Sequence, residues 1–321
     1  DEINIMKFAV ANELNENPKE KMSYFLDESL IEPTIKSKSD FADDTYSLFY
    51  NENDKVYFCT GSNGFIAMLN PESFELGYSE SEPIVKIYHP DRKDDLSDEY
   101  HLKDGKCSVA DAVEYINNWF ETTYKSFFPD YNYQVKTVIV REYGGNYLYQ
   151  FLIEALYNGV PLDSYTMEPE YTDEGFAYRM AYLPYGVTIQ MINVNSIDSF
   201  TTGGGIPIPE EEEKINECIS LESALKLCEN TFTEFRDITI SDIDIMYTLN
   251  PVYETDDEGN EFVSGYNSRP VWEFIIDVPP EDFLASGEAN TYGDTRKYIY
   301  IDMVTGELKY NFDIVKQGLG G

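Results

Sequence analysis

The chain has 321 residues and carries 60 Asp and Glu against 23 Lys and Arg, which gives a formal net charge of −37. This excess of negative charge excludes a general nucleic-acid binder, because such a protein needs cations to displace counterions from phosphates. Apolar residues make up 42% of the chain and aromatic residues 15%, which excludes an acidic disordered tail. No apolar run approaches the roughly 18 residues of a membrane-spanning helix, and the length predicts about two domains.

The first 40 residues are polar and rich in Asn, Glu, Lys and Ser, which predicts an N-terminal tether over residues 1–40. The chain begins at Asp1 without an initiator Met, as expected either of a processed mature form or of a sequence given without its leader. Many Tyr, Asn, Asp and Thr with few Lys and Arg favour a place outside a bacterial cell. We therefore expect an extracellular protein that an N-terminal lipid anchor holds at the membrane; a cytoplasmic acidic protein is the alternative.

Residues 41–200 are predicted to contain an N-terminal β segment followed by a first unit of one helix and one sheet. The segment offers three strand candidates: Tyr46–Tyr50, Lys55–Thr60 and Gly64–Leu69. These strands form either a small sheet of their own or an addition to the first unit, and the sequence leaves both open.

The helix of the first unit is predicted to begin after Ser108 and to end before Pro129. Ser108 is a suitable N-cap, and Asp111 lies where it completes a pair resembling a capping box. Apolar residues then recur with the 3.6-residue period of an amphipathic helix. They are Val109, Ala112, Val113, Ile116, Phe120, Tyr124 and Phe127.

An antiparallel sheet is predicted to cover the apolar side of this helix. Gly144-Gly145 and Asn158-Gly159 mark hairpin turns, because both central residues of a type I′ turn need positive φ. Pro184-Tyr185-Gly186 marks a third turn. The predicted strands are Tyr133–Glu142, Tyr147–Tyr157, Gly175–Tyr182 and Val187–Val194.

Residues 201–214 contain three glycines, alternating prolines and four glutamates, which predicts a linker. Residues 215–321 are predicted to be a second unit, with Ser220 capping its helix. The apolar stripe of that helix is Leu221, Ala224, Leu225, Cys228 and Phe235. The predicted strands that follow are Ile238–Tyr253, Phe262–Val278, Tyr298–Met303 and Glu307–Phe312.

Two short similarities in the same order indicate a duplicated unit. The segment from Ser108 to Val113 is echoed by Ser220 to Leu225, 112 residues later, and Tyr149–Ile153 is echoed by Trp272–Ile276, 123 residues later. A longer hairpin in the second copy would absorb the difference between the offsets. The expected fold class is therefore α+β, with tandem units of one amphipathic helix packed on a curved antiparallel sheet of three to four strands.

The second copy resembles the PepSY-like units of extracytoplasmic proteins of Gram-positive bacteria. The resemblance lies in the capped helix at Ser220, in the Pro-x-Trp-x-Phe strand that begins at Pro270, and in the hairpin Tyr298–Glu307 with its Asp-x-x-x-Gly-Glu turn. The first copy lacks that turn and has Tyr149 in place of the Trp. The resemblance implies a non-catalytic role in protease inhibition or in the control of envelope signalling and maturation.

The four cysteines, Cys59, Cys107, Cys218 and Cys228, include no C-x-x-C pair, and only two histidines are present, so no zinc site is predicted. Cys218 and Cys228 flank a helix start, and their spacing puts them too far apart to bridge each other. A disulfide between Cys59 and Cys107 stays open, and buried thiols are the preferred alternative.

No catalytic, cofactor-binding or metal-ligating residue is predicted. Neither His89 nor His101 lies beside a Ser or Cys in a nucleophile motif. The acidic clusters Asp91–Glu99 and Asp256–Glu261 offer oxygen ligands for Ca²⁺, but neither fits the EF-hand spacing. We interpret the first as a helix start or a loop and the second as a solvated hairpin tip. The glycine run that begins at Gly203 precedes prolines rather than a helix, which excludes a P-loop.

The leading hypothesis is a non-catalytic binding or regulatory protein that recognises a protein or peptide by shape and edge-strand pairing. The negative charge favours a basic partner and excludes nucleic acid, and membrane contact is expected only through the anchor. A carboxylate-based glycan hydrolase is the second hypothesis, and it requires a deep pocket with two acids about 5–9 Å apart. A passive structural lipoprotein is the third.

Overall fold

The computed structural model describes most of the chain and divides it into two compact units. The described residues are 4–10, 46–51, 56–61, 66–69, 83–92, 94–123, 125, 131–163, 165–172, 175–182, 187–202, 207–215, 217–232, 239–255, 259, 261–277 and 297–310. Unit 1 comprises residues 1–9, 160–183 and 209–321, and unit 2 comprises residues 10–159 and 184–208. The chain therefore enters each unit more than once.

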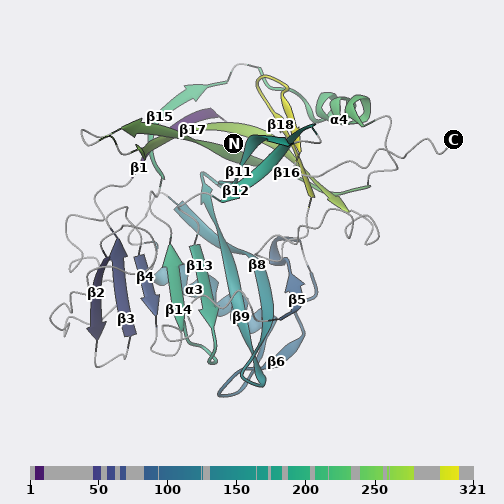
Figure 1. Cartoon of the computed structure of the whole chain (residues 1–321). Coiled ribbons are helices and arrows are strands. Elements are labelled where there is room, and N and C mark those ends of the chain that lie inside the picture. Colours follow the sequence, from purple (N-terminus) through teal and green to yellow (C-terminus); the bar gives the residue numbers. More distant parts are fainter. Residues whose placement is uncertain are drawn as a thin grey trace. The chain divides into compact units, whose positions relative to one another are not determined.

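Unit 2 is built on a large antiparallel sheet whose strands lie in the order β2-β3-β4-β14-β13-β9-β8-β5 (Figure 1). A small hairpin, β6 with β7, leads into its helix α3. The elements of unit 2 are β2 (Tyr46–Asn51), β3 (Val56–Gly61), β4 (Ile66–Leu69), β5 (Ile84–Tyr88), the 3₁₀ turn η2 (Pro90–Arg92), β6 (Glu99–His101), β7 (Lys106–Ser108), α3 (Val109–Thr122), β8 (Tyr131–Tyr143), β9 (Asn146–Tyr157), β13 (Val187–Met191) and β14 (Ser199–Thr202).

The N-terminal strands β2, β3 and β4 belong to this sheet. β4 pairs with β14, with Phe200 opposite Met68, so the strands extend the sheet of the first predicted unit instead of forming one of their own. This settles the choice that the sequence left open. The hairpin between β8 and β9 turns at Gly144 and Gly145, both with positive φ, as predicted.

Helix α3 begins at the predicted cap. The Ser108 hydroxyl oxygen accepts a hydrogen bond from the Asp111 backbone N–H at 3.0 Å, and the hydroxyl donates to Asp111 Oδ2 at 2.6 Å. The helix ends at Thr122, earlier than Pro129, and Tyr124 and Phe127 lie outside the described residues. The side chains that α3 buries are Val109, Ala112, Val113, Ile116 and Phe120.

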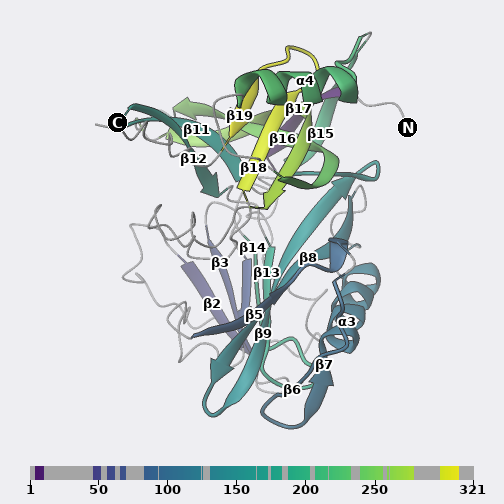
Figure 2. The same cartoon turned by 90° about the vertical axis from the view of Figure 1, so that its right-hand side faces the viewer.

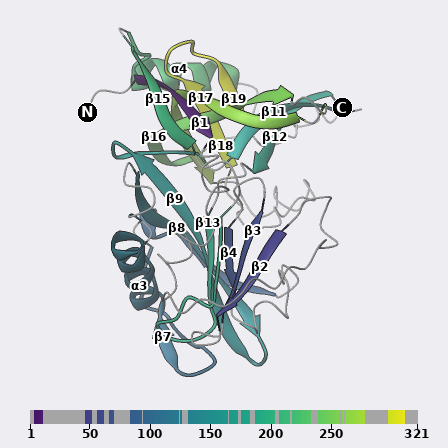
Figure 3. The ribbon, with the colours of Figure 1, turned by 90° about the vertical axis from the view of Figure 1, so that its left-hand side faces the viewer.

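These helix residues pack on one face of the unit 2 sheet, where α3 runs alongside β8 (Figures 2 and 3). The Phe120 ring stacks on that of Tyr133 at 5.1 Å, and Trp119 contacts Phe200 at 5.4 Å. Phe151 and Phe200 are fully buried. Burial of each of these aliphatic or aromatic side chains stabilises the fold by about 1.5–3 kcal/mol. The periodic apolar residues of α3 therefore predict which face of the helix is buried.

The structure corrects the prediction for residues 175–182. They form β12 and pair with β11, with Met180 opposite Met167, rather than with the strand that begins at Val187. Strand β13 pairs instead with β9 on one side and β14 on the other. The sequence predicts pairing between strands that are consecutive in the chain. Residues 175–182 belong to unit 1, however, and the strand that begins at Val187 belongs to unit 2.

Unit 1 contains a six-stranded sheet and the helix α4. β17 pairs with β16 along one edge, and its other edge pairs with β1 near Tyr266 and with β18 near Phe274. The elements of unit 1 are β1 (Asn4–Val10), β10 (Val160–Pro161), β11 (Tyr165–Thr172), β12 (Gly175–Tyr182), β15 (Pro207–Lys214), α4 (Leu221–Thr231), β16 (Thr239–Thr255), β17 (Glu261–Asp277), β18 (Lys297–Asp302) and β19 (Leu308–Tyr310).

Two segments that were predicted to lack structure are strands in this sheet. The tether prediction is wrong for Asn4–Val10, which form β1 and bury Met6 and Phe8 while Lys7 is exposed. The linker prediction is wrong for Pro207–Lys214, which form β15 beside β1. The boundary between the units nevertheless falls within the predicted linker, after Ile208.

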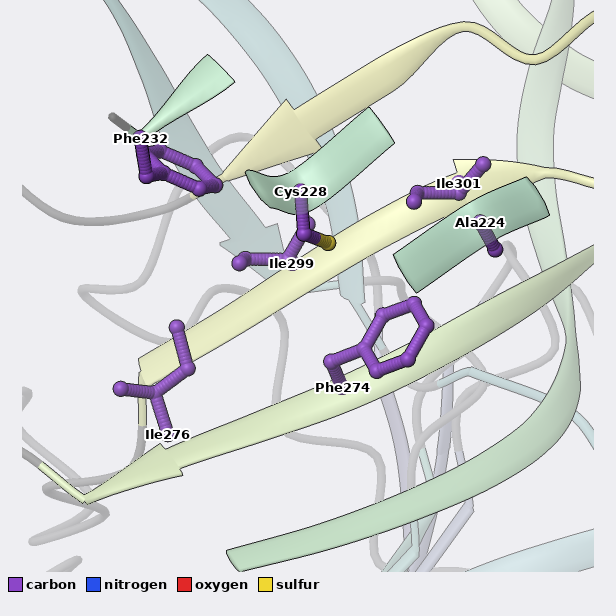
Figure 4. Close-up of a cluster of buried hydrophobic side chains, with 7 residues drawn as sticks. All are labelled: Ala224, Cys228, Phe232, Phe274, Ile276, Ile299 and Ile301. Carbon is purple, nitrogen blue, oxygen red and sulfur yellow. The ribbon is translucent and has the colours of Figure 1, made fainter. Parts of the chain in front are cut away.

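Helix α4 packs on β17 and β18 through the hydrophobic cluster shown in Figure 4. Ser220 caps the helix by accepting from the Ser223 N–H at 3.2 Å. Leu221 and Leu225 are only partly buried beside the cluster, and Phe235 lies outside the described residues. The buried members of the cluster are Ala224, Cys228, Phe232, Phe274, Ile276, Ile299 and Ile301.

The turn between β18 and β19 is the one that the sequence predicts. Asp302 Oδ1 accepts from the backbone N–H groups of Val304 and Thr305, each at 2.8 Å. Gly306 has a φ of +73°, and a Cβ there would lie 2.8 Å from Ile219 Cδ1. Glycine is needed at this position both for the left-handed backbone and for the close approach.

The protein is thus an α+β protein made mostly of antiparallel sheets, with α3 and α4 as the α-helices of its described part. Neither helix combines the length and apolarity that crossing a membrane requires. Cys107 and Cys228 are buried free thiols, whereas Cys218 is exposed and Cys59 has no described side chain.

Candidate functional site

Strand β5 ends the unit 2 sheet, next to β8 (Figure 1). Ile87 lies opposite Ile139 and Tyr88 opposite Val138, and a bulge at Val85 interrupts the register. In the described part of the chain no strand lies along the outer edge of β5. That edge therefore presents backbone N–H and C=O groups to which a further strand can pair.

The first residues of β5 expose aliphatic surface. The side chains of Ile84 and Val85 are 41% and 43% exposed, although most large apolar side chains of the described core are below 9%. Two exposed aliphatic neighbours on a terminal strand favour contact with another polypeptide, since scattered single residues would need no explanation. Ile87 is half-buried and Tyr88 is buried, so exposure is confined to the start of the strand.

A charged cluster lies on the face of β5 that carries Lys86 and Tyr88. The Lys86 ammonium donates to Asp98 Oδ2 at 2.6 Å and lies 4.6 Å from the centre of the Tyr88 ring. The Tyr88 hydroxyl donates to the same carboxylate oxygen and contacts the Tyr100 hydroxyl at 2.8 Å. This network holds the loop before β6 against β5.

The carboxylates of this cluster are stabilised in their charged form. The hydrogen bond from Lys86 lowers the pKa of Asp98, and hydrogen bonds from Ser97 lower that of Asp95. Burial and the bond to Asp98 raise the pKa of Tyr88, which is therefore a neutral donor. The carboxylates of Asp95 and Asp98 both act on the Lys86 ammonium, so the net charge of these three groups is negative.

A hollow of about 380 Å³ lies beside the first three turns of α3. Its lining combines acids, amides and one cation: Lys106, Cys107, Asp111, Glu114, Tyr115, Asn118, Val194 and Asn195. Asp111 already accepts from the capping Ser108, and Lys106 pairs with Glu99 at 2.7 Å. Asp111 and Glu114 are both exposed to solvent, whereas the general acid of a glycosidase lies in apolar surroundings.

The Cys107 thiol in this hollow is not activated as a nucleophile. Burial, with smaller contributions from neighbouring carboxylates, raises its pKa to about 11. A thiol is reactive as its thiolate, and this one is protonated near neutral pH. The hollow therefore has hydrogen-bonding capacity but holds no activated thiol.

Unit 1 contains a separate pair of buried carboxylates. Asp163 and Glu273 are 1% and 4% exposed, and both act on the buried Tyr300. Burial and these two charges raise the Tyr300 pKa well above its ordinary value. Because both carboxylates are shielded from solvent, they belong to the interior of the unit rather than to a surface that a glycan could reach.

The residues that the sequence singles out are not brought together. His89 lies after β5, and its backbone N–H donates to Asp94 at 2.7 Å; His101 is exposed at the end of β6. Within the described residues, no group of three or more His, Cys, Asp and Glu is arranged to hold a metal ion. The second acidic cluster falls largely outside the described residues, apart from Gly259 and Glu261.

Sequence reasoning missed β5 itself. Ile84-Val-Lys-Ile-Tyr88 is a run of β-branched and aromatic residues, which is typical of a strand. It lies between two stretches without a clear period, and it has no hairpin partner nearby in the sequence. Its place at the end of the sheet follows from pairing with β8, whose partner residues lie some 50 positions later.

Comparison with known proteins identifies a similar fold. No family model matches the chain, and no curated protein matches it. The crystal structure of an uncharacterised protein from Eubacterium rectale ATCC 33656 matches with a TM-score of 0.55, over 98% of this chain and 86% of that chain. Since the sequence identity is 14%, the likeness concerns the fold alone.

Proposed function

We propose that the protein is a non-catalytic binding module that takes an extended segment of a partner protein as a further strand on the outer edge of β5. The observation that carries this proposal is the terminal position of β5 together with the exposure of Ile84 and Val85. Strand addition gains affinity from backbone hydrogen bonds and specificity from alternate side chains. Neither requires a catalytic group.

The contrast between two terminal strands supports the choice of β5. The strand β15, at one end of the unit 1 sheet, contains Pro207, Pro209 and a run of four glutamates, and proline and charge both discourage pairing. In β5 the single cation, Lys86, is held by Asp98 and lies over the Tyr88 ring. Its charge therefore lies on the other side of the sheet from Ile84 and Ile87.

We also propose that unit 1 and unit 2 each contain one copy of a tandem helix-on-sheet unit. After each helix the strands follow the same order, β8-β9-β13-β14 and β16-β17-β18-β19. Corresponding residues lie opposite one another across the strands. The matching ladders are Phe151–Ile189–Phe200 and Phe274–Ile299–Tyr310.

A hydrogen bond at the start of each helix supports the same proposal. Tyr149, on β9, donates its hydroxyl to the Cys107 carbonyl at 2.6 Å. Trp272, on β17, donates Nε1–H to the Ile219 carbonyl at 2.9 Å. Each acceptor is the residue directly before the N-cap serine. Tyr149 and Trp272 are the two residues that the sequence echo aligns.

We further propose that unit 1 is PepSY-like and that the protein lies outside the cell at the membrane. A PepSY-like identity of unit 1 is supported by the motifs around Trp272 and Gly306, and an extracellular place at the membrane is supported by the acidic, tyrosine-rich composition. The sequence immediately upstream of Asp1 tests the location. An apolar leader that ends in a cysteine next to Asp1 is expected, and an initiator methionine there would contradict it.

The binding proposal is tested by selecting seven-residue peptides from a displayed random library on the full chain. Selected peptides are expected to slow amide hydrogen exchange in Ile84–Tyr88, because pairing covers the outer N–H groups. They are also expected to bind about tenfold more weakly to a variant carrying Ile84→Thr and Val85→Thr, since threonine keeps the strand propensity but removes apolar contact.

The matched control is Val304→Thr, which makes the same kind of change at a side chain that is 37% exposed in unit 1. Binding to this variant is expected to equal binding to the unmodified chain. The proposal is wrong if the library yields no binders, if bound peptides protect amides elsewhere than in β5, or if the β5 and Val304 variants bind equally well.

A further inference from the structure

We infer that the partner segment on β5 is basic and alternating, with aliphatic residues beside Ile84 and Ile87 and lysine or arginine on the opposite face. This inference rests on the proposed function and names the class of partner. It follows from the two faces of β5, from the charges that flank one of them, and from the charge of the whole chain.

The two faces of β5 differ in chemistry. Lys86 and Tyr88 lie opposite Val140 and Val138, which in turn lie opposite Tyr149 and Phe151 on the side that packs on α3. Ile87 lies opposite Ile139 and therefore on the other side of the sheet. Successive side chains of an added strand alternate between these two sides. One set of its residues consequently meets aliphatic surface, and the other set meets the charged cluster.

The charged cluster favours cations on the added strand. Asp95 and Asp98 both act electrostatically on Lys86, so two carboxylates stand against one ammonium group. The Asp98 side chain is 47% exposed despite its bonds to Lys86 and Tyr88. An opposite charge on a neighbouring strand stabilises the pair by up to about 1 kcal/mol, and a like charge destabilises it.

The charge of the whole chain excludes a second copy as the preferred occupant. Each chain has a formal charge of −37, so antiparallel pairing of β5 with β5 of another copy brings two strongly negative bodies together. The same field attracts a basic segment and accelerates its association. The carboxylates beside Lys86 and the net charge of the chain therefore both favour a basic partner segment.

Three synthetic seven-residue peptides test this inference on the full chain. Valine alternates with lysine in the first, with serine in the second and with glutamate in the third. The lysine peptide is expected to bind about tenfold more tightly than the serine peptide, and the glutamate peptide most weakly. The preference is expected to shrink as salt approaches 1 M, where the screening length falls to about 3 Å.

Variants locate the charge preference. Asp95→Asn is expected to reduce the preference for lysine over serine at least threefold, while its side-chain oxygen still accepts from Ser97. Glu222→Gln on α4 is the matched control, because it makes the same change in net charge in unit 1 and is expected to leave the preference unchanged. A peptide of the same composition, with its valines grouped at one end and its lysines at the other, is expected to bind more weakly than the alternating peptide, because it does not place valine on one face and lysine on the other.

The outcomes separate the two proposals. If none of the alternating peptides protects Ile84–Tyr88 from hydrogen exchange, strand addition at β5 is wrong. If the three bind there equally well, β5 is the site and the basic partner is wrong. Equal binding of the block peptide, or a dimer of the chain that Val85→Thr abolishes, would also overturn the inference.

Discussion

The helix of unit 2 follows Ser108 and buries five of its side chains, whereas the helix of unit 1 follows Ser220 and buries two, Ala224 and Cys228. Both helices begin with a serine cap and both are joined to an aromatic residue on a neighbouring strand. The difference lies in how much apolar surface each helix covers. Similar local signals can therefore support helices with unequal amounts of tertiary packing.

The largest expected effect comes from emptying the two cores. Phe151→Ala and Phe274→Ala each remove a ring that is fully buried, and we expect a loss of about 3–5 kcal/mol in the free energy of unfolding. Hydrogen exchange resolved by strand is expected to quicken in β8 and β9 for the first variant and in β16 and β17 for the second. Equal loss of protection in both units by either variant would show that they do not unfold separately.

A smaller effect is expected from two glycines with similar backbones. Gly306→Ala places a Cβ 2.8 Å from Ile219 at a φ of +73°, whereas Gly159→Ala at +79° meets open space. We expect about 1 kcal/mol of destabilisation for Gly159→Ala from the backbone alone and about 2 kcal/mol or more for Gly306→Ala. Urea unfolding measures the difference, and equal values would mean that Ile219 moves aside at little cost.

The aromatic hydrogen bonds are expected to contribute less. Tyr149→Phe removes the donor to the Cys107 carbonyl at a buried position, which costs about 1–2 kcal/mol. Trp272 is half-buried, so the histidine variant Trp272→His, which retains a ring N–H, should recover part of the stability that Trp272→Phe loses. If Trp272→His is less stable than Trp272→Phe, packing rather than the hydrogen bond fixes the start of α4.

The buried thiols are expected to have no pH-dependent effect on stability near neutral pH and to affect it only at high pH. Burial raises the pKa of Cys107 and of Cys228 from 9.0 to about 11. The thiols lose their protons at lower pH in the unfolded chain than in the folded chain. The contribution of the protonated thiols to the free energy of unfolding is therefore complete below about pH 9 and is lost as the pH rises to about 11. In unfolding experiments at rising pH, Cys107→Ala and Cys228→Ala are each expected to lose less stability than the unmodified chain.

Alkylation with iodoacetamide supplies the control for that prediction. The exposed Cys218 is expected to react much faster than Cys107 or Cys228, with each site followed by peptide mass. Similar rates at all three sites would contradict the burial of the two thiols. Comparable protection of Cys107 and Cys228 would extend the likeness between the helices, since each thiol lies at or near the helix of its own unit.

The local parts of the fold could be predicted from the sequence, and the long-range parts could not. The cap at Ser108, the turn at Gly144-Gly145 and the turn at Gly306 depend on a few adjacent residues, and each is confirmed. The strand Asn4–Val10 was missed because its partner residues begin at Gly265. Only the alternation of Met6, Lys7 and Phe8 could have revealed it.

The candidate site was predicted less well than the fold. Edge-strand pairing was expected, but no particular strand was named, because the end of a sheet is a property of the whole strand order rather than of any segment. The glutamate run after Pro209 looked like a linker because charge and proline are also typical of loops. Ile84 and Val85 become informative only once β8 is known to be their sole strand neighbour in the described part of the chain.

The pairing of β1 with β17 has a consequence for biosynthesis. Phe8 lies opposite Tyr266, which leaves the ribosome more than 250 residues later. At about 5–20 residues per second this is a delay of tens of seconds. All segments of unit 2 have been synthesised once residue 208 is made, so unit 2 can fold before β17, the partner of β1 in unit 1, has been synthesised. A chaperone that shields Met6 and Phe8 during that interval would protect apolar side chains whose partner strand has not yet been made.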